Sequence, residues 1–211
     1  MVNFNYKETY VRVILLKDDI YIFHQDLNDE EDFSKKLRIL KHCFVSLDIL
    51  RDSFRHFAFI IKNEEELIKK AKSLKKRLEF INHLRNKISG HLDEKVITKA
   101  IQWEPFIFSK DLIENEKARI FLIYKSLIES SINSYIDCNS NQSVFDTEID
   151  LAYPPNQKLF FNYVGDLNLD AIDFLTEIEK IIINTIKFWG ETELFEMAKK
   201  AGETDFNLKM N

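Results

Sequence analysis

Three polar side chains near the middle of the chain have the types and spacing to act on a phosphodiester. Arg85 and Asn86 are adjacent, and His91 follows directly after Gly90. An imidazole titrates near neutral pH and can pass a proton to or from a hydroxyl. A guanidinium stabilises the negative charge of a phosphoryl transition state, and an amide can orient either partner. Together these groups suffice for cleavage of RNA by its own 2′-hydroxyl, without a metal.

The three side chains lie in a stretch with helical periodicity. Apolar residues over 67–92 recur at steps of three and four, and Arg85 stands where the next apolar residue should be. A guanidinium keeps its proton, so in an apolar seam it needs an acceptor, a ligand or water. Two interpretations follow. Either a buried acid such as Asp48 or Asp52 pairs with Arg85 and His91 merely ends the helix, or the seam faces a binding pocket.

A straight helix does not focus the three groups on one target. Arg85 and His91 are about 9 Å apart along the axis and about 120° apart around it, and Asn86 lies about 100° to the other side. Two arrangements would bring them together. The helix can bend at Ser89–Gly90, or a two-fold symmetric partner can place a second copy of the seam beside the first. The second arrangement accommodates a buried Arg85 more easily.

The segment 85–93, RNKISGHLD, resembles the signature of HEPN domains, in which a polar residue follows an Arg and a His comes several residues later. The form R-N-K-x-x-x-H-x-D is similar to that of abortive-infection HEPN proteins of bacteria. Five residues separate Arg85 from His91, whereas the commoner form has four. Asp93 either steadies His91 or caps the next helix.

This resemblance implies a fold, a function and partners. It implies an up-down helical bundle that dimerises through the motif helices around a shared cleft. It also implies a metal-independent endoribonuclease that acts as a toxin or phage-defence effector, often beside a nucleotidyltransferase-type antitoxin. By the same resemblance Arg85 and His91 are catalytic and Asn86 supports them. Many HEPN domains are non-catalytic, so a module that binds a nucleotide or a protein partner is the alternative.

Basic residues near the motif are candidates for binding RNA. Lys76, Arg77 and Lys87 would steer the substrate, and Arg51 and Arg55 on the preceding helix would lie near the same pocket. The alternative is a solvated face that pairs with acids upstream, with arginines that snorkel at the edge of an apolar stripe. The net charge of −5 argues against wholesale nucleic-acid binding but leaves room for a local basic surface.

The composition favours an all-α protein that positions this motif. The chain is 45% hydrophobic and has only four Gly and three Pro, too few for many tight turns. The aromatic stretch 103–108 is interpreted as a core plug rather than a base-stacking platform. Residues 11–16 are rich in β-branched side chains and are the one place where a strand competes with the helix. The pattern predicts helices at about 6–27, 30–61, 64–90, 93–103, 114–136 and 168–189.

The whole chain, 1–211, is predicted to form one domain of four to six helices. An irregular insertion near 138–167 is expected to carry short strands, with a hairpin around Pro154-Pro155-Asn156, and 202–211 is expected to fray. Cys43 and Cys138 lack the spacing of a metal site, and no cofactor is predicted. The absence of a secretion-signal layout and of a membrane-length apolar run favours a cytoplasmic protein without membrane contact.

Overall fold

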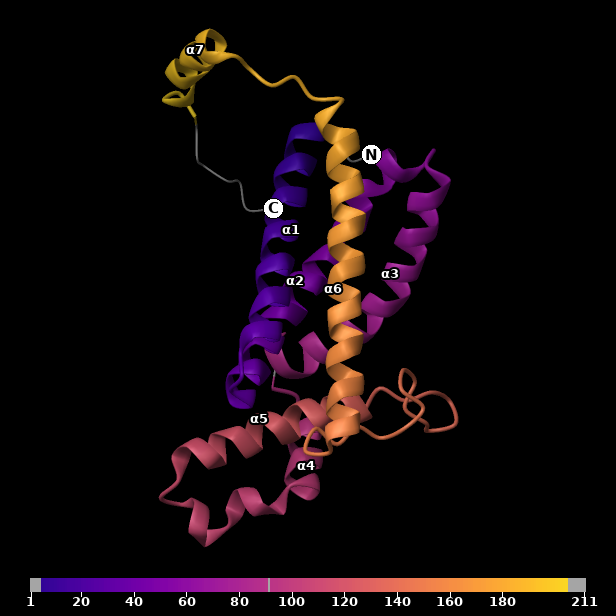
Figure 1. Cartoon of the computed structure of the whole chain (residues 1–211), viewed down its shortest axis with the longest axis vertical. Helices are drawn as coiled ribbons and strands as arrows, with labels where there is room; N and C mark the ends of the chain where they lie inside the picture. The colour runs from indigo at the N-terminus through magenta and orange to yellow at the C-terminus, as the bar shows by residue number, and fades with distance from the viewer. Residues whose placement is uncertain (1–4, 91, 205–211) are drawn as a thin grey trace.

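The computed structural model of the protein describes residues 5–90 and 92–204, and over these ranges the fold is all-α, as predicted. A π-helical turn, η1 (Arg85–Gly90), follows α3, and two 3-10 turns, η2 (Pro105–Phe108) and η3 (Lys110–Leu112), lie between α4 and α5. The helices are α1 (Tyr6–Asp29), α2 (Phe33–Ile61), α3 (Glu65–Leu84), α4 (Glu94–Trp103), α5 (Glu116–Asn133), α6 (Pro154–Ile183) and α7 (Glu191–Ala201) (Figure 1).

Four long helices form the body of the molecule. α1 packs against both α2 and α6, and α3 packs against α2 and α6, so the four run along one long axis (Figure 1). α4 and α5 pack on each other at the lower end of this bundle. Burial of large apolar side chains stabilises the bundle because each contributes about 1.5–3 kcal/mol on leaving water. The fully buried ones include Ile20, Phe44, Leu47, Phe57, Leu78, Phe160 and Phe174.

Polar side chains fix where the helices begin. Asn5 and Asp32 accept hydrogen bonds from the first backbone amides of α1 and α2, which satisfies donors that have no partner within the helix. Asp93 does the same for α4, which confirms its predicted capping role, whereas its other predicted role concerns His91, a residue outside the described ranges. The alternative of a strand over 11–16 is wrong, because these residues lie inside α1.

The predicted insertion is half helical. α6 begins at Pro154 and not near 168, so the expected hairpin and strands there are wrong. Two prolines at the first helical positions are favourable because their fixed φ suits a helix and their missing N–H groups would have no partner there. The irregular part is therefore limited to 134–153, where the only described bridge joins Ile136 and Gln142. Gln142 holds this loop by bonds to the backbone on both sides of the turn.

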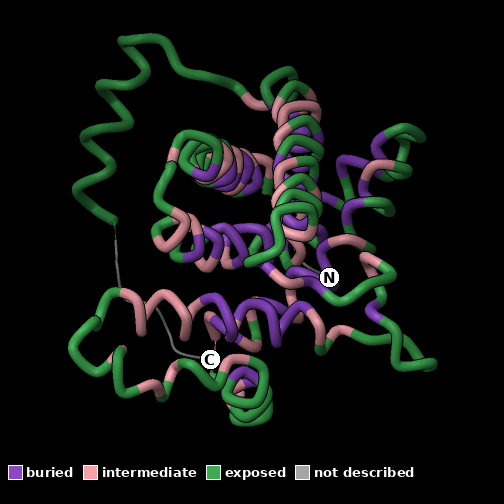
Figure 2. Tube along the Cα trace, turned by 60° about the horizontal axis from the view of Figure 1, so that its bottom comes forward, coloured by how far each residue is buried: buried purple, intermediate pink, exposed green. Residues whose placement is uncertain are grey.

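The aromatic stretch 103–108 is not a core plug. The side chains of Phe106 and Phe108 are 69% and 68% exposed, because η2 lies on the outside of the α4–α5 pair. The last predicted helix is also interrupted: α6 ends at Ile183, an extended linker follows, and α7 is exposed along its whole length (Figure 2). None of the described helices is long and apolar enough to cross a membrane.

A buried charged cluster joins α4, α5 and the loop that precedes α6. Lys125 lies 3.2 Å from carboxylate oxygens of both Glu104 and Glu129. The fully buried Glu129 also accepts hydrogen bonds from the indole N–H of Trp103 (3.0 Å) and from the backbone N–H of Leu151 (2.6 Å). Burial opposes the charge of Lys125, but the two carboxylates outweigh it and raise its pKa. We refer to these residues as the buried cluster.

Candidate functional site

The predicted motif lies on the π-helical turn. α3 is regular to Leu84, and η1 then widens the helix from Arg85 to Gly90. Of the two arrangements considered for this motif, a departure from the regular α-helix is present, and it begins at Arg85 and includes Ser89 and Gly90. Turns of this kind are rare and occur often at functional sites, because the wider turn changes where the following side chains point.

Arg85 pairs with an acid from α2. Its Nε lies 3.6 Å from Oδ2 of Asp48, whose side chain is only 10% exposed, so the predicted alternative of a buried acidic partner is confirmed for Asp48. Its Nη1 donates a hydrogen bond to Oδ1 of Asn86 (3.0 Å). The Arg85 side chain is 36% exposed and lies at the edge of the seam rather than inside it. Among the described residues its Nη2 has no acceptor, so that nitrogen is available to a ligand.

Asp48 holds a second arginine as well. Arg51 donates from Nε to Oδ1 of Asp48 (2.9 Å), which places it beside Arg85 as predicted. Arg51 also pairs with Asp52 at 3.0 Å and with Glu79 at 3.8 Å. Because three carboxylates surround it, Arg51 is a positioning cation and not a free phosphate ligand. Asp48, Arg51 and Arg85 are called the motif cluster below.

Gly90 allows this position of Arg85. A Cβ atom built on Gly90 would lie 2.9 Å from Nη1 and 3.3 Å from the guanidinium carbon of Arg85. Real Cβ atoms essentially never approach other heavy atoms so closely, so a side chain here would displace the guanidinium. Asn86 is held in turn by Asn82, to whose side-chain oxygen it donates at 2.9 Å. The arginine is thus fixed by its acid, by an amide and by close contact with a glycine.

The third member of the predicted site, His91, lies outside the described residues. The chain on either side of it is tied together by Lys87, whose Nζ lies 2.6 Å from Oδ2 of Asp93. The Lys87 hydrogen bond, with help from the backbone amides that Asp93 caps, lowers the pKa of that carboxyl. Lys87 is therefore already engaged with a carboxylate, contrary to its predicted role as a free RNA-steering cation.

The outer face of α3 is also largely paired, which favours the alternative of a solvated charged face. Arg77 forms an ion pair with Asp170 and donates to the backbone carbonyl of Tyr163. Lys76 is exposed and has no carboxylate partner among the described residues. Arg55 is exposed and donates to its neighbour His56. Of the five predicted RNA-binding residues, the structure brings only Arg51 and Lys87 close to Arg85 or the turn that holds it.

Sequence reasoning missed a basic and aromatic surface next to η1. Ser89 donates from Oγ to the backbone carbonyl of Lys41 (3.2 Å), which seats the turn on α2. The charged ends of Lys41 and Arg38 lie 5.1 and 5.8 Å from the ring centre of Tyr124 on α5. Neither cation has a carboxylate partner among the described residues. The spacing of 38 and 41 on one helical face was visible in the sequence, but their meeting with Tyr124 depends on the tertiary packing.

His83, two residues before the motif arginine, is partly buried against α5. Its Nε2 lies 3.0 Å from both the carbonyl of Ser131 and the hydroxyl of Ser134, and its ring packs on Tyr135. Burial lowers the pKa of His83, with nearby Lys87 acting in the same direction. His83 therefore belongs to the packing of the end of α3 against α5 and not to the motif.

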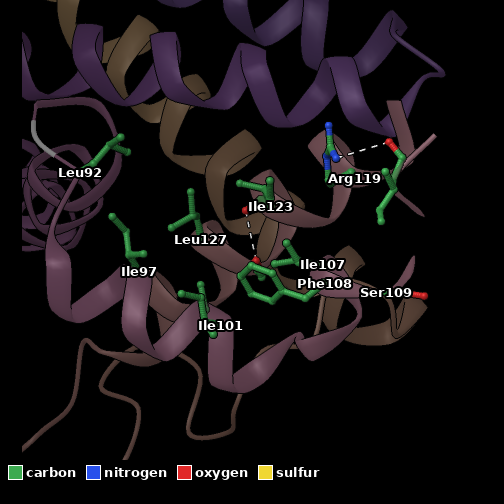
Figure 3. Close-up of a pocket in the computed structure, with 12 residues that line it drawn as sticks. Leu92, Ile97, Ile101, Ile107, Phe108, Ser109, Arg119, Ile123 and Leu127 are labelled. Atoms are coloured by element: carbon green, nitrogen blue, oxygen red, sulfur yellow. Dashed lines mark hydrogen bonds between the residues drawn. The ribbon is translucent and has the colours of Figure 1, made fainter. Parts of the chain in front are cut away.

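A cavity of about 580 Å³ opens between α4, η2, η3 and α5 (Figure 3). Its apolar side chains point toward one another, and Leu92, the residue after His91, is one of them. Arg119 lies at the rim, where it donates to the carbonyl of Ile113 (3.5 Å). Such a lining favours apolar contact rather than phosphate binding. The apolar lining residues include Leu92, Ile97, Ile101, Ile107, Phe108, Ile113, Ile123 and Leu127.

Comparison of the chain with protein-family models, with curated proteins and with solved structures gives no match. Within residues 5–90 and 92–204, no three His, Cys, Asp or Glu side chains gather as a metal site would require. The free thiols are Cys43, which is buried, and Cys138, which is exposed. Burial raises the pKa of Cys43 to about 12, so this thiol is unreactive.

Proposed function

We propose that this chain is a HEPN-like, metal-independent endoribonuclease that works as a homodimer in the cytoplasm. The observation that carries the proposal is the position of Arg85. Its guanidinium is fixed by Asp48, Asn86 and Gly90 on a π-helical turn, and its Nη2 is open to a ligand. A partly desolvated arginine held in this way is ready to bind a phosphate without reorganising.

The chemistry follows from the residue types. In the proposed reaction the 2′-oxygen attacks the adjacent phosphorus, and the bond to the 5′-oxygen breaks. His91 of one protomer would take the proton of the 2′-hydroxyl, and His91 of the other would protonate the leaving 5′-oxygen. Arg85 would bind the non-bridging oxygens, where negative charge builds up, and Asn86 would hold the guanidinium in place. The products are a cyclic phosphate and a free 5′-hydroxyl.

Exposed apolar side chains beside the motif support dimerisation at this end of the molecule. Leu92, Phe108 and Ile113 are each more than 60% exposed, and all three line the cavity between α4 and α5. Clustered apolar surface of this kind is characteristic of protein interfaces. A two-fold axis here would bring two motif turns together, which is the arrangement that a catalytic pair of histidines needs.

The unpaired cations suggest where RNA would approach. Ser89 and Arg85 contact α2 at Lys41 and Asp48, which are separated by about 10 Å of helical rise, or about two turns. Arg38, Lys41 and Tyr124 would thus continue a phosphate path that begins at Arg85, and Tyr124 could stack on a base. Because Arg77 and Lys87 are paired with carboxylates, they are weaker candidates than these three.

Cleavage of total RNA in excess EDTA tests the proposal. We expect cleavage by the wild type, loss of at least about 100-fold in Arg85→Ala and His91→Ala, and no loss in Lys180→Ala, an exposed cation in the last turn of α6. Unchanged activity in the two motif variants would place the chemistry elsewhere.

Sedimentation of Phe108→Asp beside the similarly exposed Phe195→Asp tests the dimer, which only the first change should weaken.

A non-catalytic module is the second candidate, and the ion pairs of the site favour it. Arg85 already has a carboxylate at 3.6 Å and Lys87 has one at 2.6 Å, so the site is partly neutralised without any substrate. In that case the same surface would bind a nucleotide or a partner of the nucleotidyltransferase type within a toxin–antitoxin or phage-defence assembly. A folded, dimeric wild type that leaves RNA intact would favour this function.

A further inference from the structure

The C-terminal helix α7 is amphipathic but covers nothing in the described structure. None of its residues is buried, and it stands away from the bundle on the side of α1 (Figures 1 and 2). Leu194, Met197, Ala198 and Ala201 share one face by their spacing, and Phe195 widens it. Leu194 is 49% and Phe195 65% exposed. An isolated helix of this length is marginal in water, so this face needs a partner.

The linker fixes where α7 starts. Phe188 packs edge-to-face on Tyr10 with ring centres 5.8 Å apart, and the Nζ of Lys7 lies 3.8 Å from the ring centre of Trp189. Both partners belong to the first turns of α1. The beginning of α7, two residues after Trp189, is therefore held at the N-terminal end of α1.

A groove begins at the same lysine. It has a volume of about 760 Å³ and follows α1 from Lys7 to Asp19, with Ile49 of α2 on its other side. Its apolar floor is open to solvent: Val11 is 56%, Leu15 61% and Ile49 44% exposed. Lys7 thus belongs both to the groove and to the contact that holds the linker.

The lengths of helix and groove agree. The 11 residues of α7 span about 16 Å, and the 12 steps from Lys7 to Asp19 span about 18 Å.

The cavity between α4 and α5 is out of reach of α7 within the same chain. It lies near the other end of the 30-residue α6, about 45 Å away, whereas the linker 184–190 spans at most about 25 Å.

The charges of α7 and of the groove are complementary when α7 runs parallel to α1. If α7 runs parallel to α1, its acidic start, Glu191 and Glu193, meets Lys7 and Arg12 of the groove, two cations that flank Glu8. Its basic end would then meet the acidic end of the groove. The residues concerned at that end are Lys199 and Lys200 on α7, and Asp19 of the groove on α1.

From these observations we infer that α7 is an intramolecular strap that docks in the groove of α1 and α2, parallel to α1, by rotation about Gly190. Nothing lies within 4 Å of a Cβ built on Gly190, so the hinge has room to turn. Docking places Leu194 near Val11 and Ala198 near Leu15, and it covers the exposed apolar floor. This inference does not depend on the proposed ribonuclease activity.

Disulfide trapping tests the strap. In a full-length Cys138→Ser background, Leu15→Cys with Ala198→Cys should form a disulfide within one chain, at least tenfold faster than a control pair that joins Ala198→Cys to Lys72→Cys on α3. Non-reducing electrophoresis and peptide mass spectrometry distinguish the products. A disulfide between two chains would mean that α7 docks on a second copy, and a rate equal to the control would mean that it does not dock here; either result overturns the inference.

A second set of variants tests the apolar contact. Leu194→Asp, added to the Leu15→Cys and Ala198→Cys pair, should slow disulfide formation at least fivefold, whereas Glu196→Ala on the opposite face should leave it unchanged. Circular dichroism would verify that the bundle still folds, as expected for a helix with no buried residue. Equal rates for the two variants would contradict docking through the apolar face.

Discussion

The buried cluster and the motif cluster both hold charges on helices, but they are built in opposite ways. In the buried cluster one cation lies between two carboxylates, and Trp103 and the backbone of Leu151 complete the bonding of Glu129. In the motif cluster one carboxylate, Asp48, lies between two arginines, and the outer one is open to solvent. The first arrangement has little left to bind, whereas the second leaves donors of Arg85 available. The comparison shows why ion pairing alone does not mark a functional site.

The largest effect is expected from cutting the buried cluster. Glu129→Leu leaves Lys125 buried with only Glu104, so the free energy of unfolding should fall by about 3–5 kcal/mol. The double variant with Lys125→Met should regain most of this loss. Urea titration measures both. A loss below about 1 kcal/mol for Glu129→Leu would mean that the buried cluster contributes little to holding α4 and α5 together.

Removal of the outer arginine should affect function and not stability. Arg85→Ala should change the free energy of unfolding by less than about 1 kcal/mol, since Asp48 keeps Arg51 and Arg85 is partly exposed. The same variant should lose about two to three orders of magnitude in RNA cleavage. Urea titration and the cleavage assay on one preparation give both numbers. A large loss of stability would place Arg85 with the buried cluster as a structural residue.

Gly90→Ala should also affect RNA cleavage without lowering the free energy of unfolding. Alanine favours the helical turn by up to about 1 kcal/mol, but its Cβ would displace the Arg85 guanidinium. We expect equal or slightly higher stability with about tenfold weaker cleavage. Gly202→Ala, near the end of α7 and far from the motif, is the matched control. Wild-type activity in Gly90→Ala would show that contact with Gly90 does not position Arg85.

The smallest effect concerns pH. Because burial lowers the pKa of His83 below its ordinary value of 6.5, the unfolded chain binds a proton at a higher pH than the folded chain. This contribution to stability is complete above pH 6.5 and is lost as the pH falls toward the lowered pKa. His83→Asn should flatten the stability curve over that interval. Urea titrations at several pH values would measure the slope, and equal slopes for both proteins would contradict the assignment.

Much of the bundle could be predicted because its helices are long and periodic. α1, α2 and α5 lie within a few residues of their predicted positions, and the pairing of Arg85 with Asp48 was one of two stated alternatives. The local sequence pattern placed the start of α6 too late in the chain. Pro154 and Pro155 are as compatible with a loop turn as with the first turn of a helix. The pattern also placed Phe106 and Phe108 in the core, although only tertiary packing decides which face of η2 is covered.

The candidate site could be predicted in type but not in arrangement. Arg85, Asn86 and His91 were singled out from residue type and spacing. The widened turn, the contact with Gly90 and the approach of Tyr124 to Lys41 depend on how η1 packs against α2 and α5. For the basic residues, the sequence overestimated how many cations are free to bind RNA. Arg77 and Lys87 resemble free cations in the sequence, but Arg77 pairs with Asp170 from a distant segment and Lys87 pairs with Asp93 later in the chain.

The π-helical turn has a consequence for the length of the motif. A hydrogen bond from i to i+5 encloses one residue more than the bond of an ordinary α-turn. The chain has five residues between Arg85 and His91, one more than the commoner form of the motif it resembles. If the proposed HEPN resemblance holds, the wider turn would house that additional residue locally. The extra residue of the motif would then form a bulge in the helix and would not shift the segments that follow it.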